Sequence, residues 1–301
     1  MTVWLSVSAP LQAKPIDVAE AVTIGNIKQW IQIRGAQDTL PVLLFLHGGP
    51  GNSVMGYAEK FTRKLQRHFV VVQWDQRESG KTARLNSSPV PVSVSVMESD
   101  ASEMVDYLRK RFGRDKIFIV GHSWGGFLAL RVADLHPEWL SACVAVAPMI
   151  QQWESERQTL AWLQEKATQG NKEEAIRELS QVKVPFQAPD ELYLHRKWLA
   201  IFAGKDPVSR AYVLKWSEKW FALYREACGI NLFETLPKLH CPVYFFVGRE
   251  DRQASSTITE AYYRSVMAQK KELIWFTNSG HSLNLTEPIK FQDTLIGLLP
   301  N

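Results

Sequence analysis

The stretch from Lys116 to Leu130 reads KIFIVGHSWGGFLAL, and it constrains the fold more than any other part of the chain. An apolar run ends at Val120, the pattern G-x-S-x-G follows at 121–125, and a helical pattern continues from there. Where a strand turns sharply into a helix around this pattern, the serine is lifted above the sheet beside a helix N-terminus. Glycines at both ends of the pattern let such a tight turn close. We therefore expect Ser123 to be a nucleophile at the apex of a strand–turn–helix unit.

Short, almost wholly apolar runs indicate the sheet that carries this unit. They are Val42–Leu46, Phe69–Trp74, Ile117–Val120, Ala142–Ala147 and Val243–Val247. Such runs are typical of strands buried on both faces of a parallel sheet. Residues 20–34 instead alternate apolar and polar types around Gly25-Asn26, which predicts an antiparallel hairpin. Because helix-period stretches such as 98–111 lie between the runs, we predict an α/β fold, with a mostly parallel central sheet flanked by helices and antiparallel strands at one edge.

One long segment interrupts this alternation. From Met149 to about Leu236 the sequence shows no convincing strand and is rich in Trp, Glu, Lys and Gln at helical spacing. Three aromatic residues spaced four apart would share one helix face, namely Trp216, Trp220 and Tyr224. We predict a core domain formed by 1–148 and 237–301, with a helical cap at 149–236 inserted after the sixth strand. The alternative is a second structural subdomain without a functional role.

Composition and charge narrow the possible partners. The chain has 301 residues, 46% hydrophobic and 22% charged, as in an ordinary globular protein with one large domain or two small ones. Its formal net charge of +4 comes without a dense run of Lys and Arg, so nucleic acid is not an expected partner. No apolar run approaches the roughly 20 residues of a membrane span. We expect a small-molecule or short-peptide substrate, and the oligomeric state stays open.

The cysteines and the N-terminus bear on the compartment. Cys143, Cys228 and Cys241 have no metal-like spacing, and we expect buried thiols in a reducing compartment. The stretch 2–9 is mildly apolar but lacks the basic start of a signal peptide. We therefore expect a cytoplasmic protein, the alternative being an exported one with its signal removed. No metal or cofactor is expected.

A serine nucleophile needs a base and an acid, which follow it in the chain in the order acid, then histidine. Of the seven histidines, His281 follows both the turn at Ser123 and a plausible acid, and it comes after the strand-like run 273–276. The run that ends at Val247 continues as GRED, which offers Glu250 and Asp251. We prefer Asp251 for its position after the glycine, with Glu250 as the alternative.

The remaining histidines have less specific expected roles. His122 adjoins Ser123, but at so tight a turn its side chain is expected to point elsewhere. His47 is expected to brace the glycine-rich loop in LLFLHGGPGN, residues 43–52. The other four are expected at the surface or satisfied in the core, namely His68, His136, His195 and His240.

The glycine-rich loop at 47–51 can hold an anion against its backbone N–H groups. No Lys-Ser/Thr pair follows the glycines, as a phosphate-binding loop would require. With Ser123, Asp251 and His281 in order, the anion is expected to be a transient oxyanion on a substrate carbonyl.

Several motifs together resemble those of the α/β hydrolases, and within them the proline iminopeptidase-like serine aminopeptidases. They are HGGPG at 47–51, WDQRESG at 74–80, GHSWGG at 121–126, GRED at 248–251 and GH at 280–281. These motifs cover both halves of the predicted sheet domain, roughly two thirds of the chain. The set is much more specific than G-x-S-x-G alone.

The resemblance implies release of an N-terminal residue, often proline, from peptides through an acyl-enzyme. Ser123 would attack the carbonyl, His281 would move the proton, and Asp251 would hold the imidazole. By analogy, the backbone N–H groups of Trp124 and Gly49 would form the oxyanion hole.

The chain also departs from this family pattern. Glu78 stands where the family usually has glycine. That family binds the substrate's free amine with cap glutamates near tryptophans, and Glu218 and Glu226 are candidates without a residue-by-residue match. Two other functions stay open, a capped carboxylesterase or lactonase-type acyl hydrolase and a non-catalytic receptor with a hydrolase fold. The aspartate-nucleophile hydrolases are disfavoured because Ser123 occupies the turn.

Overall fold

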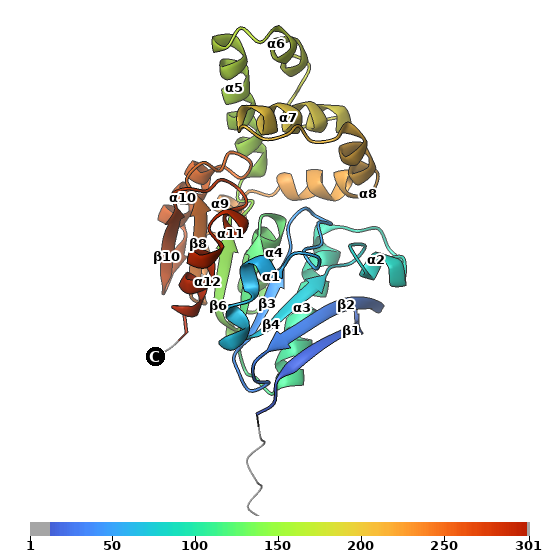
Figure 1. Cartoon of the computed structure of the whole chain (residues 1–301), viewed down its shortest axis with the longest axis vertical. Helices are drawn as coiled ribbons and strands as arrows, with labels where there is room; N and C mark the ends of the chain where they lie inside the picture. The colour runs from blue at the N-terminus through green and yellow to red at the C-terminus, as the bar shows by residue number, and fades with distance from the viewer. Residues whose placement is uncertain (1–12, 300–301) are drawn as a thin grey trace, which may run out of the picture.

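A computed structural model of the chain describes residues 13–299, so the stretch 2–9 considered above lies outside the described residues. An eight-stranded sheet forms its centre, in the order β1-β2-β4-β3-β5-β6-β8-β10 (Figure 1). The strands are β1 (Ile16–Ile24), β2 (Ile27–Gly35), β3 (Val42–Leu46), β4 (Val70–Asp75), β5 (Ile117–His122), β6 (Leu140–Val146), β8 (Val243–Gly248) and β10 (Lys271–Phe276). Only β2 runs antiparallel to its neighbours β1 and β4, and the other pairs are parallel. The predicted mostly parallel sheet is confirmed.

The predicted hairpin is formed by β1 and β2 at one edge of the sheet. Gly25 and Asn26 both have positive φ angles, 56° and 60°, which a two-residue hairpin turn requires. The hairpin is longer than predicted, because β1 begins at Ile16. The predicted helix 98–111 lies within α3 (Val94–Phe112), which the Ser93 side chain caps at its start.

Helices cover both faces of the sheet. One face carries α3, α4 (Trp124–Leu135) and α10 (Ser256–Ser265), and the other carries α1 (Glu59–Thr62), α11 (Leu283–Thr286) and α12 (Pro288–Ile296). Successive residues of the central strands serve alternate cores. Leu44 and Ile119 pack with the first layer, and Leu43 and Phe118 with the second. This explains why these strands read as continuous apolar runs.

Shorter elements complete the core. They are η1 (Leu65–Arg67), α2 (Thr82–Leu85), η2 (Pro137–Trp139) and a small parallel pair, β7 (Lys238–Leu239) with β9 (Met267–Ala268). No helix within residues 13–299 is long and apolar enough to cross a bilayer.

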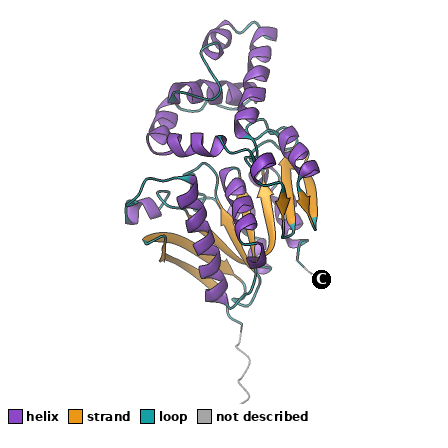
Figure 2. Cartoon of the chain, turned by 180° about the vertical axis from the view of Figure 1, so that it is seen from behind, coloured by secondary structure: helices purple, strands orange, loops and turns teal. Residues whose placement is uncertain are grey.

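Five helices lie between β6 and β7. They are α5 (Gln152–Gln169), α6 (Glu173–Leu179), α7 (Pro189–Phe202), α8 (Arg210–Cys228) and α9 (Leu232–Thr235). Figures 1 and 2 show α5 to α8 standing above one end of the sheet, as a cap would. The predicted helical insertion after the sixth strand is therefore confirmed, and we propose the limits 149–236 for it. On α8, Trp220 and Tyr224 are buried and Trp216 is half-buried.

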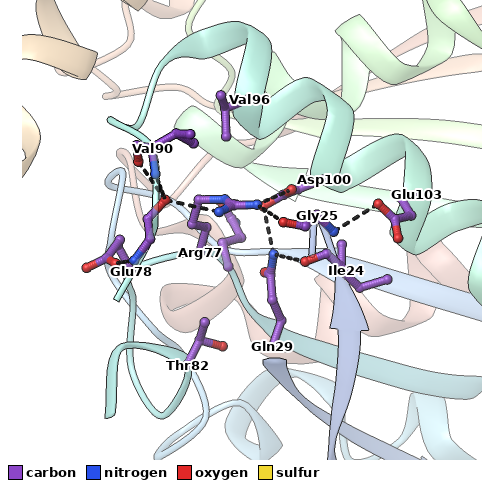
Figure 3. Close-up of polar contacts among 12 residues, drawn as sticks. Ile24, Gly25, Gln29, Arg77, Glu78, Thr82, Val90, Val96, Asp100 and Glu103 are labelled. Carbon is purple, nitrogen blue, oxygen red and sulfur yellow. Dashed lines mark hydrogen bonds and ion pairs between the residues drawn. The ribbon is translucent and has the colours of Figure 1, made fainter. Parts of the chain in front are cut away.

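A buried ion pair fixes the segment that follows β4. The guanidinium of Arg77 donates to both carboxylate oxygens of Asp100 on α3, at 2.7 and 2.8 Å, and the two side chains are 3% and 2% exposed. Gln29 of β2 donates to the same carboxylate at 2.7 Å, and Arg77 also donates to the carbonyl of Gly25 (Figure 3). A buried charge pair is stable only when its remaining hydrogen-bonding groups are satisfied, and these contacts satisfy them. They tie the hairpin, α3 and the segment after β4 together.

The cysteines and the less specific histidines lie where they were expected. Cys143, Cys228 and Cys241 are free and buried, and burial raises the pKa of each thiol. His195 is buried in the cap, His68 and His136 are half-buried, and His240 is exposed.

Candidate active site

Ser123 lies at the apex of the turn between β5 and α4, as its sequence context predicts. Its backbone angles are φ 57° and ψ −117°, a region that residues other than glycine rarely adopt. A Cβ on Gly121 would lie 1.9 Å from the carbonyl oxygen of Gly125, and one on Gly125 would lie 2.2 Å from that of Leu46. Only glycine fits at these two positions. The strain at Ser123 is thus imposed by close backbone packing on both sides.

His281 and Asp251 meet at the ends of neighbouring strands. His281 follows β10, and its Nδ1 is 2.9 Å from Oδ2 of Asp251, which follows β8. The other oxygen of Asp251, which is 3% exposed, accepts from the N–H groups of Gln253 and Ala254 at 2.9 and 3.0 Å. Because the carboxylate accepts, Nδ1 of His281 carries the proton and Nε2 is left as the basic nitrogen. Glu250, the alternative acid, is exposed and does not contact the imidazole among the described hydrogen bonds.

Ser123 and His281 line one pocket of about 270 Å³. No hydrogen bond joins their side chains among the described residues; such contacts often tighten only with substrate bound. Phe45, Val54 and Leu285 contribute apolar walls to the pocket. Most of its surface is polar, so it is a small, mainly polar chamber with one apolar side, and it opens onto the serine.

His122 lies closer to this pocket than the sequence suggests. Its Nε2–H donates to the backbone carbonyl of His281 at 2.8 Å, and the two rings are 4.9 Å apart. The expectation that its side chain points elsewhere is therefore wrong. Burial, followed by the neighbouring His281, lowers the pKa of His122 to about 4. It is a neutral support for the loop that carries His281.

The buried side chain of Gln76 joins the glycine-rich loop to the turn at Ser123. Its Nε2 donates to the carbonyl of His47 at 2.9 Å, and its Oε1 accepts from the indole N–H of Trp124 at 3.0 Å. His47 is fully buried, and its Nε2 accepts from the backbone N–H of Gln76 at 3.2 Å and lies 3.0 Å from the Ser79 hydroxyl. Burial lowers the pKa of His47. His47 therefore braces the loop, as expected; the role of Gln76 was missed, although it lies within the WDQRESG motif.

Two backbone groups named as oxyanion donors lie beside the serine. Gly48 and Gly49 both line the pocket, and a Cβ on Gly48 would lie 3.2 Å from the Cβ of Ser123. The N–H of Trp124 opens α4, where the first amides of a helix have no intrahelical acceptor. Gly49 thus lines the same pocket as Ser123, and Trp124 follows Ser123 directly in the chain.

The cap helix α8 rests on the glycine-rich loop. The indole N–H of Trp216 donates to the carbonyl of Pro50 at 2.8 Å, and the hydroxyl of Tyr212 donates to Oδ1 of Asn52 at 3.1 Å. Gly51 has φ 85°, and a Cβ there would lie 2.3 Å from the ring of Trp220. The aromatic face predicted on this helix therefore packs on the loop.

Glu78, the departure from the family pattern, adds an ionic contact to the same helix. Its backbone is in the left-handed region, with φ 59°, where glycine is usual. Its carboxylate accepts from the ammonium of Lys219 on α8 at 2.6 Å and from the N–H of Ser88. These contacts, with partial burial working against them, lower the pKa of Glu78.

A second cavity of about 730 Å³ lies between the cap and the loop that carries Asp251. His281 and Gln253 line both cavities. The charged residues on its walls are Lys166, Arg196, Lys205, Asp206, Glu250, Asp251 and Arg252. The cap therefore presents both signs of charge next to His281.

The glutamates proposed from the sequence as amine ligands lie elsewhere. Glu218 pairs with Lys215, and Glu226 accepts from the N–H of Val94; neither lines a cavity with Ser123 or His281. The fully buried cap glutamate is Glu156, whose carboxylate is held by Arg196 at 2.5 and 2.7 Å and by the hydroxyl of Tyr224. The charge of Arg196 and these hydrogen bonds outweigh burial and lower the pKa of Glu156 to about 2. Among residues 13–299 no three His, Cys, Asp or Glu side chains gather as they would around a metal ion.

Comparisons with known proteins bear on the fold and the family of the chain. Residues 41–288 match the family model described as the alpha/beta hydrolase fold. The chain is 27% identical to a protein of Bacillus subtilis named as a probable aminopeptidase, over 94% of this chain and 96% of the relative. It is also 27% identical to a proline iminopeptidase of Lactobacillus delbrueckii subsp. bulgaricus, over 90% and 94% of the two chains. The solved proline iminopeptidase of Mycobacterium smegmatis shares the fold with a TM-score of 0.63 at 17% identity, over 93% and 97% of the two chains.

We predict that Gln76→Met lowers both stability and activity. The substitution removes the partners of the His47 carbonyl and the Trp124 indole, and each buried group left unpaired costs about 1–3 kcal/mol. The matched control is Gln73→Met, because both amide atoms of the buried Gln73 have no partner among the described residues. Urea unfolding and turnover of the two variants check this. Equal behaviour of the two would contradict the role given to Gln76.

We predict that the free energy of unfolding falls as the pH drops from about 6.5 towards 4. Burial lowers the pKa of His47 and brings those of His122 and His195 from 6.5 to about 4, so in this window the unfolded chain binds protons that the native state does not. Each such histidine contributes a slope of up to about 1.4 kcal/mol per pH unit. Urea unfolding across the window measures it. His195→Gln should reduce the slope, and an unchanged slope in this variant contradicts the assignment.

Proposed function

The chain belongs to the α/β-hydrolase family, and from this premise we propose that it is a serine peptidase of the proline iminopeptidase type. As a member of the family it is a hydrolase. The observation that carries the proposal is the 2.9 Å hydrogen bond between His281 and Asp251 beside Ser123 on its strained turn. The names of two curated relatives, an aminopeptidase and a proline iminopeptidase, favour peptide substrates.

In the proposed reaction Ser123 attacks the carbonyl carbon of the substrate's first residue. A serine hydroxyl is a weak nucleophile, so Nε2 of His281 takes its proton as the bond forms. Asp251 holds the imidazole through Nδ1 and stabilises the positive charge that His281 acquires.

The tetrahedral intermediate places a negative charge on the former carbonyl oxygen. We propose that the backbone N–H groups of Trp124 and Gly49 donate to this oxygen. Loss of one such donor typically lowers turnover by about 10²–10³. The contacts that Gln76 makes to both neighbouring segments support this role, because they hold the two segments in one geometry.

The intermediate then breaks down in two stages. His281 gives its proton to the leaving amine and the C–N bond breaks. The rest of the peptide departs, and the N-terminal residue stays on Ser123 as an ester. Water, deprotonated by His281, then attacks the ester and restores the serine hydroxyl. The small pocket beside Ser123 suits a single compact residue, and the larger cavity beyond His281 has room for the rest of a short peptide.

We predict that Ser123→Ala lowers kcat by roughly 10⁴ or more, since no other group can form the acyl-enzyme. The fold should be preserved, because alanine removes only the hydroxyl. Steady-state kinetics and thermal unfolding of the variant check the two statements. Near-wild-type hydrolysis by a folded Ser123→Ala protein would rule out the mechanism.

A substrate panel tests the peptidase assignment. We expect cleavage of L-prolyl and L-alanyl 4-nitroanilides and loss of activity on the N-acetylated prolyl amide, because an aminopeptidase needs the free amine. Hydrolysis of short acyl esters alone, or equal cleavage of the blocked amide, would make the protein an acyl hydrolase of another kind. Failure of a fluorophosphonate probe to label Ser123 would point to a receptor.

A further inference from the structure

Two residues, His281 and Gln253, line both the pocket beside Ser123 and the larger cavity next to the cap, and no other residue within 13–299 lines both. In the proposed reaction the leaving amine takes its proton from His281. The part of a peptide that directly follows the scissile bond therefore passes from one cavity to the other at His281, where Gln253 also lies. A side chain at this place contacts the leaving group and not the residue that stays on Ser123.

The backbone of Gln253 is held at both of its polar groups. Its N–H donates to Oδ1 of Asp251 at 2.9 Å, and its carbonyl accepts from Nε2 of Gln152 on α5 at 2.7 Å. The Cα atom of Gln253 is thus fixed relative to the candidate acid and to the cap. A substitution of the side chain leaves both contacts in place, because the backbone makes them.

The side-chain amide of Gln253 has no such partner. Neither its Oε1 nor its Nε2 makes a hydrogen bond with another described residue, and the residue is half-buried. The two atoms are accessible, unlike the unpaired amide atoms of Gln73, which are closed off inside the protein. The amide therefore presents a donor and an acceptor to whatever occupies the two cavities.

Two arginines of the larger cavity are the alternative donors to a substrate carbonyl. The terminal nitrogens of Arg196 already donate to Glu156 and to the hydroxyl of Tyr224. The guanidinium of Arg252 lies 4.3 Å from the ring centre of Trp162, and Arg252 lines the larger cavity but not the pocket beside Ser123. Arg252 is thus the competing group that a test has to exclude.

We propose that Gln253 determines specificity for peptides by binding the peptide group that follows the scissile bond. This inference rests on the proposed aminopeptidase function and names the residue that recognises the leaving part of the substrate. Nε2 of Gln253 donates to the carbonyl of the second residue, and Oε1 accepts from the N–H group that comes after it. The two groups match because each has a donor beside an acceptor. A simple ester or an arylamide lacks this peptide group and gains nothing from Gln253.

The test compares two amides of proline that differ beyond the scissile bond. L-Prolyl-glycinamide carries the second peptide group, and L-proline isobutylamide has an alkyl group of similar size in its place. Their leaving amines differ in basicity, so the quantity compared between proteins is the ratio of the two kcat/KM values. Gln253→Met removes the donor and the acceptor and keeps an unbranched side chain. We expect the ratio to fall about tenfold, the value of one hydrogen bond.

A second variant and a matched control locate the contact. Gln253→Ser withdraws the polar group from the cavities and should lower the ratio as Gln253→Met does. Gln151 is also a half-buried glutamine, its side chain makes no capping hydrogen bond to α5, and it lines neither cavity, so Gln151→Met should keep the parent ratio. Thermal unfolding verifies that each variant is folded.

Two outcomes overturn the proposal. If Gln253→Met lowers kcat/KM equally for both amides, the residue has a structural role and not one in specificity. If Arg252→Met lowers the ratio and Gln253→Met does not, the peptide group is bound by the arginine.

Binding measurements separate this inference from the proposed function. Calorimetric or NMR titration of the Ser123→Ala protein measures the affinity for each amide without turnover. Adding Gln253→Met should weaken L-prolyl-glycinamide about tenfold relative to the isobutylamide. Failure of the parent protein to cleave either amide overturns the peptidase assignment, and the titration then still decides the role of Gln253. Cleavage of both amides with an unchanged ratio in Gln253→Met overturns the role of Gln253 alone.

Discussion

The hydrogen bonds of one buried amide, Gln76, hold the candidate site together. The glycine-rich loop and the turn at Ser123 follow the paired strands β3 and β5, whose ladder reaches Leu46 and Gly121. Beyond these residues both segments are irregular, and side chains have to hold one against the other. Gln76 does so by donating to the His47 carbonyl and accepting from the Trp124 indole. The next residue, Arg77, is anchored by Asp100 beneath the sheet edge. A fully satisfied polar network of this kind gives loops the rigidity that regular elements obtain from their backbones.

The features that the sequence predicted well are those set by neighbours along the chain. The turn at Ser123, the hairpin at Gly25-Asn26 and the doubly buried strands follow from local geometry and from the period of apolar residues. The helical insertion was also recognisable, because it breaks the alternation of strands and helices. The predicted strands differ from the observed ones at their ends, as for β1, which begins at Ile16 and not at residue 20.

The features that the sequence could not predict depend on contacts between distant segments. Nothing local to Gln253 shows that it lines both cavities together with His281, and nothing local to His122 shows that it supports His281. Glu78 was recognisable as unusual, but its partner Lys219 was not. The prediction that Glu218 and Glu226 bind the amine was wrong for the same reason. Composition gives the types of residue but not the direction in which a helix presents them.

The way α8 rests on the glycine-rich loop has a consequence for how a substrate enters. Trp216, Trp220 and Lys219 bind the cap to the loop and to the segment beside it. A swing of α8 away from the sheet would break these contacts and free the glycine-rich loop, which carries one of the proposed oxyanion donors. The substrate would then enter in one conformation of the cap and react in another. With the cap open the site would then be inactive, and closing of the cap over a substrate would restore the geometry of the glycine-rich loop.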